Sequence, residues 1–473
     1  MQHAEAINEL APEQYGSRKL KNSIDQALHK RLSYDIMRQL RQPGLLCSND
    51  AKSCYDRILH SVAALAYKRI GILSQPVDSM LKCIQDMNFH IQTSFGLSSD
   101  SMNKFNTQSP FQGILQGNGA SPTTWALISV PLLNMLRVKG HGAKFFSPLS
   151  KELTHIVGFA FVDDIDLLTF DMFDSEKSWD TLSDCMQEAI NRWEQGGLKT
   201  TGGAIVPSKS WVYPIDFKFD SKGKPEYKSM EEIEQTYSVL DKDNNSQLLQ
   251  RYEAHIGKET FGVFLAPDGN NKAAKLGLEK KAKIWRDNIK AGHLTPTLAW
   301  HAANTTIMKS LEYPLPALTL TFDECNRIMK IVKQGLLNSS RVSVSIPSAS
   351  LYSPKSEGGL QLHHLYHTQG FLQVEKLYKY LNTDTVTGKL LRVSLEASII
   401  EVGIGRNLFA LDYTKFHKLI SEAWIKAFGN FLLNTKYISL IEQPIIPSPV
   451  VKVTFFLWRL WFTKVTRQKS FKF

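Results

Sequence analysis

The sequence has few cysteines, and none is placed for a disulfide framework or a zinc knuckle. An odd number of cysteines without a close C-x-x-C pair argues against both; they are Cys47, Cys54, Cys83, Cys185 and Cys325. The N-terminus also lacks a basic segment followed by an apolar one, the pattern of a secretory signal. We therefore expect an intracellular, reducing setting, with nucleus and cytoplasm not distinguished.

No apolar run is long enough to span a membrane. The most apolar late stretch runs from Val450 to Phe462 and contains Lys452 and Arg459. It is shorter than the roughly 20 residues that a spanning helix needs. We expect a packed helix or strand there, and no membrane association.

Acidic residues are in deficit relative to basic ones. The chain has 56 Lys and Arg against 45 Asp and Glu, which gives a net charge of +11. Basic side chains release counterions when they contact a polyanion, so this balance suits a nucleic-acid partner. With 43% hydrophobic and 21% charged residues the composition is globular, and the length allows about three packed units.

Three of the acidic residues stand at the ends of predicted strands. Asp50 follows the apolar run Gly44–Cys47, and Asp163 and Asp164 fall at the predicted turn of a hairpin over 156–170. Carboxylate oxygens are ligands that Mg²⁺ prefers, and two such ions can activate an attacking 3′-hydroxyl and neutralise a leaving pyrophosphate. We predict that the three acids converge on two Mg²⁺ ions, with Mn²⁺ as the alternative ion.

A glycine-rich loop lies between these acids. Its core, Gln116 to Gly119, has few Cβ atoms, so main chain can approach a base pair or template closely. Ser121 and Pro122 suit the N-cap and first position of a helix that continues to Leu136, with a kink at Pro131. The loop lacks the Gly-Lys-Ser/Thr ending of a phosphate-binding P-loop, and an ordinary turn is the alternative.

Taken in order, these motifs resemble those of the reverse transcriptases of non-LTR retrotransposons, from about residue 10 to 270. Phe161-Val162-Asp163-Asp164 is similar to the family's aromatic-x-Asp-Asp box, and Asp50 with Tyr55 to its Asp-x-x-x-x-aromatic motif. The loop from Gln116 to Pro122 is similar to its Gln-Gly-x-x-x-Ser-Pro motif. The resemblance implies an α+β right-hand polymerase with an antiparallel palm sheet, a fingers remnant and a helical thumb.

It also implies RNA-templated DNA synthesis, with an RNA template, a DNA primer and dNTPs as partners. Asp50 and Asp163 would hold the metals with Asp164 assisting, and Gln116, Gly117 and Ser121 would form the substrate loop. The sequence indicates no oligomeric state.

The resemblance assigns roles to three further residues. Tyr55 would underlie the incoming sugar and collide with a 2′-hydroxyl; a core aromatic is the alternative. Lys209 would protonate the leaving pyrophosphate or offset its charge, whereas an exposed lysine is often only solvated. Arg18, in a stretch from Gln14 that is similar to the last fingers motif, would contact template phosphate.

Four regions follow from this resemblance: a fingers remnant at 1–43, a palm at 44–270, a thumb at 271–345 and a C-terminal helical region at 346–473. We expect a helix over 10–40 and an insertion or extended loop over 216–258. Because earlier fingers motifs and an endonuclease are missing from the sequence, we expect an N-terminally truncated relative.

Two later segments add to the picture. Phe261 to Gly269 ends in Pro-Asp-Gly, predicts a hairpin, and resembles the one that supports the primer terminus. Residues 272–290 carry many lysines on a helical pattern, which suits either a thumb helix lying along a duplex or a solvated amphipathic face.

Two apparent metal motifs do not meet the chemistry. His363 and His367 are spaced to share a helix face with His364 beside them, but without a further ligand nearby we expect structural histidines. The stretch from Asp241 to Asn245 resembles a calcium loop, yet Ser246 replaces the required glycine and Tyr252 the bidentate glutamate.

Two alternative functions remain open at this point. An RNA-dependent RNA polymerase is the nearest enzymatic alternative, but that class favours Gly-Asp-Asp and a polar residue in place of Tyr55. The other is a decayed retroelement fragment that binds nucleic acid without chemistry.

Overall fold

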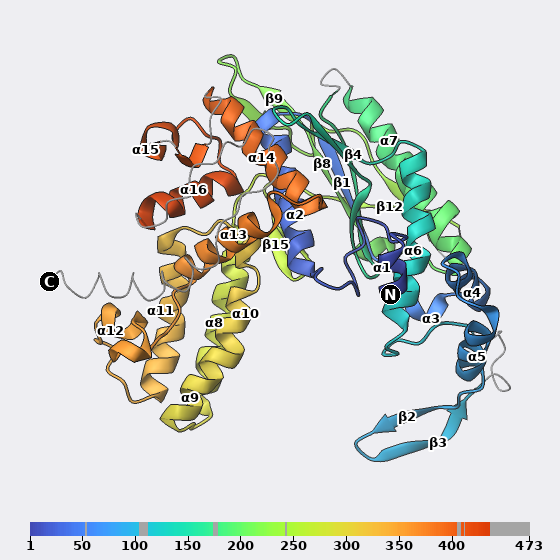
Figure 1. Ribbon diagram of the computed structural model, residues 1–473, viewed down its shortest axis with the longest axis horizontal. Coiled ribbons are helices and arrows are strands. Elements are labelled where there is room, and N and C mark those ends of the chain that lie inside the picture. Colours follow the sequence, from blue (N-terminus) through green and yellow to red (C-terminus); the bar gives the residue numbers. More distant parts are fainter. Residues whose placement is uncertain are drawn as a thin grey trace. The chain divides into compact units, whose positions relative to one another are not determined.

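The computed structural model divides the chain into two compact units (Figure 1). It describes residues 1–435, apart from 53, 104–111, 174–177, 242–243, 404–407 and 411. The first, here called the sheet unit, consists of Met1–Gln26, Gln42–Lys144 and His155–Glu253. The second, the helical unit, consists of Ala27–Arg41, Phe145–Thr154 and Ala254–Phe473. The predicted strand or helix over 450–462 lies outside the described residues.

A seven-stranded sheet has the order β13-β8-β1-β7-β4-β5, with β6 also paired to β7. The sheet unit contains all of these strands except most of β4 and β5, which fall in the segment Phe145–Thr154. The strands are β1 (Gly44–Asn49), β4 (Ala143–Ser147), β5 (Glu152–Ile156), β6 (Gly158–Phe161), β7 (Asp164–Asp171), β8 (Trp211–Ile215) and β13 (Gln250–Arg251). The predicted strand before Asp50 and the predicted hairpin are therefore confirmed, although Asp164 begins β7 and does not stand in the turn.

The expectation of a purely antiparallel sheet is wrong. The pairs β1–β7, β1–β8 and β6–β7 are antiparallel, whereas β4–β7 and β13–β8 are parallel. Parallel partners need a long connection between them rather than a tight turn, and both pairs have one. The sheet is therefore mixed and the fold is α+β, while the palm and thumb assignments remain predictions.

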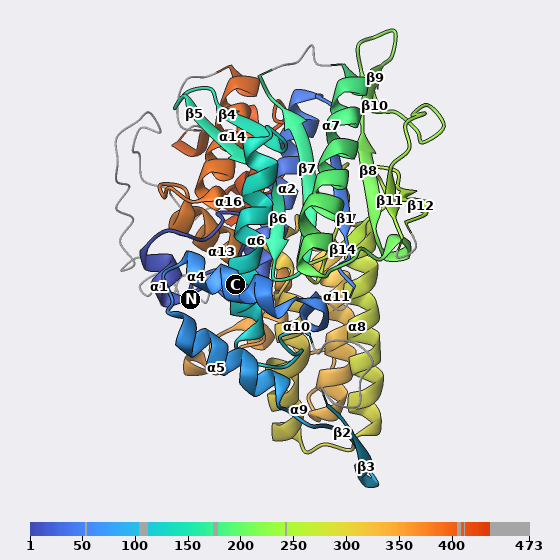
Figure 2. The same cartoon turned by 90° about the vertical axis from the view of Figure 1, so that its right-hand side faces the viewer.

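Helices cover one face of this sheet (Figure 2). Alternate residues of β1 and β7, including Cys47 and Leu167, pack with Trp125 of α6 and Met186 of α7 in one buried cluster. The helices of the unit are α1 (Gln2–Ala6), α3 (Cys54–Arg57), α4 (His60–Arg69), α5 (Ser74–Gln85), α6 (Ser121–Val138) and α7 (Trp179–Asn191). Beyond α5 a separate hairpin of β2 (Phe89–Thr93) and β3 (Gly96–Met102) follows.

The helix expected over 10–40 is shorter than predicted. Only α2 (Ser23–Leu40) is helical, because Ser17 and Leu20 adopt positive φ angles of 59° and 61°, which a helix does not allow. Before α2, Gln14 instead forms a parallel bridge to Ala160 of β6. The irregular segment thus extends the sheet.

The segment 216–258, which we expected to be an insertion or an extended loop, is anchored to the core. Its small hairpins are β9 (Phe217–Phe219) with β10 (Pro225–Tyr227), and β11 (Ser238–Leu240) with β12 (Ser246–Leu248). Its buried hydrophobic side chains are Phe217, Ile233, Tyr237, Val239, Leu249 and Ala254. The Tyr237 hydroxyl also bonds that of Ser183 on α7 at 2.9 Å. Widely spaced anchors of this kind give no periodic signal in a polar sequence.

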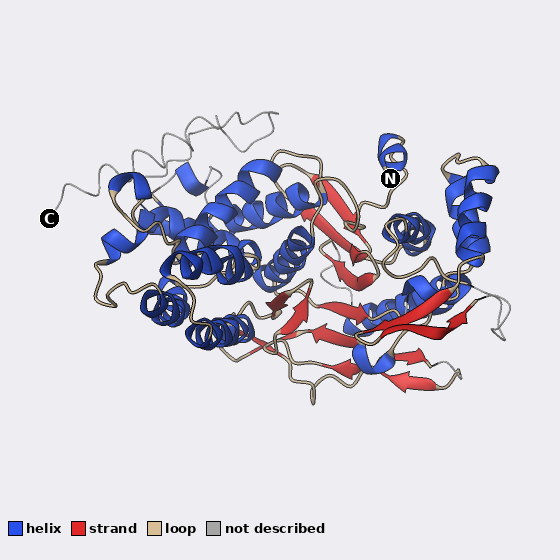
Figure 3. Ribbon diagram, turned by 90° about the horizontal axis from the view of Figure 1, so that it is seen from below, coloured by secondary structure: helices blue, strands red, loops and turns tan. Residues whose placement is uncertain are grey.

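Helices dominate the helical unit (Figure 3). The helix α8 (Lys272–Ala291) buries Ala274, Leu278, Ala282 and Ile289 and packs along α11 (Phe322–Ser339). The other helices include α9 (Pro296–Ala302), α10 (Met308–Glu312), α12 (Ser348–Tyr352), α13 (Leu365–Tyr380), α14 (Val386–Val402), α15 (Tyr413–Phe416) and α16 (Trp424–Thr435). In the described part of the chain, no helix is long and apolar enough to cross a membrane.

The hairpin predicted around 261–269 exists, but its turn lies earlier than expected. Strands β14 (Lys258–Thr260) and β15 (Val263–Leu265) are joined by Phe261 and Gly262, both with positive φ. Two consecutive positive φ angles are typical of a two-residue hairpin turn. The Pro-Asp-Gly stretch follows β15 and leads into α8 instead.

Candidate active site

The register of the central strands brings the predicted acids to one end of the sheet. The last recorded pair of β1 and β7 is Asn49 with Ile165, so the next residue of each strand is Asp50 and Asp164. Phe161 pairs with Asp164 across the β6–β7 hairpin, which leaves Val162 and Asp163 as its two-residue turn. Asp50 and Asp164 therefore stand side by side at the end of the two strands, and Asp163 is the next residue, in the turn.

The directions of the pKa shifts at this end of the sheet agree with the proximity of Asp50 and Asp163. Burial raises the pKa of the half-buried Asp163, and the nearby Asp50 carboxylate raises it further. Burial also raises the pKa values of Cys54 and Tyr55, with Asp163 as the next cause for each. Negative charge is thus concentrated at this end of the sheet, where a cation would be stabilised.

One cation already contacts the acids. The Lys209 ammonium lies 3.4 Å from a carboxylate oxygen of Asp50, with the two side chains 70% and 35% exposed. Lys209 ends the short 3₁₀ turn Pro207–Lys209 before β8, and β8 pairs with β1. The resemblance assigned Lys209 to the pyrophosphate of the nucleotide, and in the structure Lys209 contacts Asp50.

Oxygen ligands at the end of β1 and in the adjacent turn suit a hard divalent ion. Within the described ranges, however, no three His, Cys, Asp or Glu side chains are grouped closely enough to hold a metal ion. A shared ion would require the carboxylates to reorient, with Asp50 leaving Lys209. Mg²⁺ commonly uses one or two carboxylates and completes its shell with water and substrate phosphates, so the donor set fits that ion.

Tyr55 lies between the acids and the glycine-rich loop. Its side chain is half-buried and packs against the core cluster, and its carbonyl accepts a hydrogen bond from Ile114 N at 2.8 Å. The charges of Asp163 and Asp164 both act on its hydroxyl. The ring therefore serves partly as core and partly as a wall beside the acids.

Hydrogen bonds fix the glycine-rich loop at both ends. Gln116 and Gly117 are exposed, and Gln116 N donates to a carboxylate oxygen of Asp56 at 3.2 Å. Ser121 is buried, and its hydroxyl donates to the carbonyl of Leu115 at 2.7 Å. Ser121 thus anchors the loop at its buried end, while Gln116 and Gly117 are exposed and the Gln116 N–H is bonded to Asp56.

The start of the following helix differs by one residue from the prediction. The N-cap of α6 is Ala120, so Ser121 and Pro122 occupy the first two helical positions, and the helix continues through Pro131 to Val138. The Ser121 hydroxyl donates to a loop carbonyl instead of capping the helix, and Ala120 occupies the N-cap position.

Arg18 is not brought to the acids. Its guanidinium binds the Glu5 carboxylate at 2.7 Å and 2.8 Å and donates to the carbonyls of Ala11 and Gln14. The side chain is only 10% exposed. Arg18 therefore ties α1 to the segment before α2, and this arrangement leaves little of it for a template phosphate.

Sequence reasoning missed the residues that hold the turn. Gln14 and Trp125 both hydrogen-bond the Val162 peptide, directly before Asp163. Gln14 stood in a motif, but nothing local in the sequence connects it to a residue so far along the chain.

In the helical unit, α8 presents exposed lysines at 280, 281, 283 and 290. Lys275 lies 3.8 Å from Glu324, and Arg286 is bonded to the adjacent Asp287 at 2.8 Å. The remaining lysines form a solvent-facing basic surface, as either a duplex contact or a solvated face would require.

The predicted structural role agrees with the contacts of His364, which is buried, whereas His363 and His367 are exposed. His363 and His364 precede α13, so only His367 stands on the helix, and the expected shared helix face is absent. The His364 ring stacks on Phe322 with centroids 5.2 Å apart, and its Nε2 bonds Asn326 at 2.9 Å.

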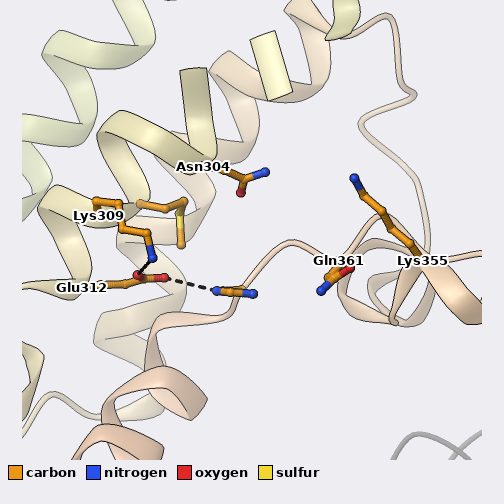
Figure 4. Close-up of a pocket in the computed structure, with 7 residues that line it drawn as sticks. Asn304, Lys309, Glu312, Lys355 and Gln361 are labelled. Atoms are coloured by element: carbon orange, nitrogen blue, oxygen red, sulfur yellow. Dashed lines mark hydrogen bonds and ion pairs between the residues drawn. The ribbon is translucent and has the colours of Figure 1, made fainter. Parts of the chain in front are cut away.

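A cavity of about 230 Å³ lies in the same unit (Figure 4). Glu312, at its wall, is bonded to Lys309 at 3.0 Å and to His363 at 3.3 Å. Burial opposes ionisation of Glu312, but these two partners hold its pKa below the usual value. Its carboxylate is already neutralised, so this cavity offers no evident reactive group.

No protein-family model matches the chain, and no curated protein matches it. Among solved structures, the chain is similar to telomerase from Candida albicans in complex with the TWJ fragment of telomeric RNA, at 9% identity and a TM-score of 0.30. It is also similar to apo telomerase from Candida tropicalis, at 10% identity and a TM-score of 0.31. Each match covers 83% of this chain and 57% or 60% of the other, so this chain spans less than two thirds of their length. Similarity at this level identifies neither the fold nor the activity of this chain.

Proposed function

We propose that this chain carries the catalytic site of an RNA-templated DNA polymerase of retrotransposon origin, acting by two-metal nucleotidyl transfer. The observation that carries the proposal is the strand register that sets Asp50 beside Asp164 of β7 and the adjoining turn residue Asp163. The resemblance of the surrounding motifs to reverse transcriptases supports the choice of reaction.

In the proposed reaction the primer 3′-hydroxyl oxygen forms a bond to the α-phosphorus of a dNTP. The bond from that phosphorus to the bridging oxygen breaks, and pyrophosphate leaves with its electron pair. Two Mg²⁺ ions, when bound, would promote loss of the hydroxyl proton to water and stabilise the leaving group.

The chain's own residues would orient the reactants. Asp50 and Asp163 would hold the ions, with Asp164 assisting, and Lys209 would move from Asp50 to offset charge on the pyrophosphate. The exposed main chain of Gln116 and Gly117 would lie against the template base.

Nucleic-acid binding without chemistry is a second candidate. The ion pair between Lys209 and Asp50 favours it, since this contact occupies a proposed metal ligand. An RNA-templated RNA polymerase differs from the main proposal only in the nucleotide it accepts.

Primer extension on an RNA template with a labelled DNA primer and Mg²⁺ separates these candidates. Asp163→Asn should lower extension at least about 100-fold, because metal ligation supplies several kcal/mol of transition-state stabilisation. Asp78→Asn, which changes an exposed acid on α5, is the matched control and should extend like the parent. Normal extension by Asp163→Asn would refute the site. Binding without extension by the parent would favour the second candidate, and extension with rNTPs alone would indicate an RNA polymerase.

Sugar selection tests the role proposed for Tyr55. If its ring collides with a 2′-hydroxyl, Tyr55→Ala should raise ribonucleotide incorporation about tenfold or more relative to dNTPs, whereas Tyr55→Phe should keep the parent's preference. Equal preference in the parent and Tyr55→Ala would leave Tyr55 only its core role.

A further inference from the structure

The turn that carries Asp163 contains a residue in an unfavourable conformation. Val162 has a φ of 59°, in the left-handed region, which a β-branched side chain rarely adopts. Such a conformation persists only where the surrounding structure holds it in place. The groups around Val162 therefore determine where Asp163 points.

The Gln14 side chain binds both polar groups of the Val162 residue. Its Oε1 accepts from Val162 N at 2.8 Å, and its Nε2 donates to Val162 O at 2.9 Å. The same amide accepts from Gly16 N at 2.9 Å and donates to the Ser129 hydroxyl at 3.3 Å. A primary amide has four such bonds to make, and Gln14, which is 0% exposed, makes all of them.

Two further contacts close around the same turn. The indole Nε1 of Trp125 donates to Val162 O at 2.7 Å. A Cβ at Gly16 would stand 2.3 Å from Val162 N, so only glycine allows the segment this close. The segment runs beside β6, where Tyr15 N donates to Ala160 O at 2.9 Å. The N-terminal segment therefore contacts both backbone groups of Val162, and α6 contacts its carbonyl.

We propose that Gln14 is a positioning residue, which holds Val162 in its left-handed conformation and so aims the Asp163 carboxylate at the ions beside Asp50. This inference rests on the proposed function, because it gives the acids their metal-binding role.

The chain provides a matched control in Gln26. Gln26 is also a buried glutamine, and its Nε2 donates to Ala160 O at 2.9 Å, in the same strand but two residues before Val162. Its Nε2 also donates to Glu13 O at 2.5 Å, so it ties the same segments together at Glu13 and Ala160 rather than at Val162. Both substitutions, Gln26→Met and Gln14→Met, remove a buried amide. Only Gln14→Met also removes the hydrogen bonds to Val162 N and O.

Two measurements on the full chain test the inference. Hydrogen exchange in metal-free buffer reads the turn directly, through the peptide that contains Val162 N. Mn²⁺ titration followed by electron paramagnetic resonance reads metal affinity without any turnover. In Gln14→Met we expect exchange at Val162 about tenfold faster, the scale of one lost hydrogen bond, and Mn²⁺ affinity about fivefold weaker or more. Gln26→Met should stay within about twofold of the parent in both.

Different results would contradict the positioning role of Gln14 and the proposed metal site. Unchanged exchange at Val162 in Gln14→Met, or equal acceleration in Gln26→Met, would overturn the positioning role alone. Unchanged Mn²⁺ affinity in Asp163→Asn would overturn the proposed metal site, and the positioning role with it. If Gln14→Met does not fold, Gln14→Glu keeps the acceptor for Val162 N but loses the donor to Val162 O. Mn²⁺ affinity is then the readout, and an affinity equal to the parent's would overturn the positioning role.

Discussion

The acidic cluster of the sheet unit and the histidine cluster of the helical unit look alike in the sequence and differ in the structure. Each offers three side chains of a type that binds metals. At the sheet end, burial and the neighbouring Asp50 both raise the pKa of Asp163. In the helical unit, His364 is fully engaged instead: Nε2 bonds Asn326, Nδ1 accepts from Tyr366 N, and the ring stacks on Phe322.

The difference indicates how a functional cluster is distinguished from a structural one. Where partners within the protein complete each polar group, the cluster stabilises the fold. Where the fold holds like charges near each other at a cost in free energy, a bound ion or substrate can relieve that cost. By this criterion the acids form the functional cluster, whereas the buried His364 is a structural residue and His363 and His367 lie exposed beside it.

The largest effect we predict comes from His364. Burial, aided by His367 and Lys333, lowers the pKa of His364 to about 4. The unfolded chain, with an ordinary histidine pKa near 6.5, then binds the proton more readily than the folded chain. The contribution to stability is complete above about pH 6.5 and is lost as the pH falls toward 4, by roughly 2–3 kcal/mol at pH 4.5.

Urea unfolding at pH 7.5 and pH 4.5 measures this loss. Other groups titrate over the same range, so the comparison is with His364→Gln, which cannot titrate there. The parent should lose more stability than the variant by the amount given above. Equal losses would mean that His364 is not held neutral, and the contrast between the two clusters would fail.

A smaller effect concerns the acidic side of the comparison. Gly16→Ala would place a methyl group against the Val162 backbone, and overpacking of this kind costs about 2 kcal/mol. Gly119→Ala is the control, since nothing lies within 4 Å of a Cβ there. Thermal unfolding should show a clear loss for Gly16→Ala and almost none for Gly119→Ala. Similar melting of the two variants would show that the turn is not tightly held.

The smallest effect concerns the basic surface of α8. If Lys280 and Lys281 contact phosphate, replacing both by glutamine should weaken primer–template binding several-fold and reduce the slope of log affinity against log salt by about 2. Lys222 and Lys224, exposed in the sheet unit, provide a control with the same charge change. If both pairs weaken filter binding equally, the α8 lysines contribute only to the overall positive charge and do not contact phosphate specifically.

The features predictable from sequence were those with local patterns. The apolar run before Asp50, the hairpin around Asp163 and the basic helix each carry a periodicity or a turn signal within a few residues. The grip of Gln14 on Val162 joins residues 148 positions apart, and the buried anchors of 216–258 are too widely spaced for a period. The role of Arg18 likewise depends on Glu5, which only the folded chain brings to it.

The most direct test of the central claim locates the metal itself. Fe²⁺ in place of Mg²⁺, with ascorbate and peroxide, cleaves a polypeptide backbone close to the bound ion. We expect cuts near Asp50 and near Asp163, suppressed by excess Mg²⁺ and lost in Asp163→Asn, and no cut near His363 to His367. Cleavage near the histidines, or none near the acids, would contradict it.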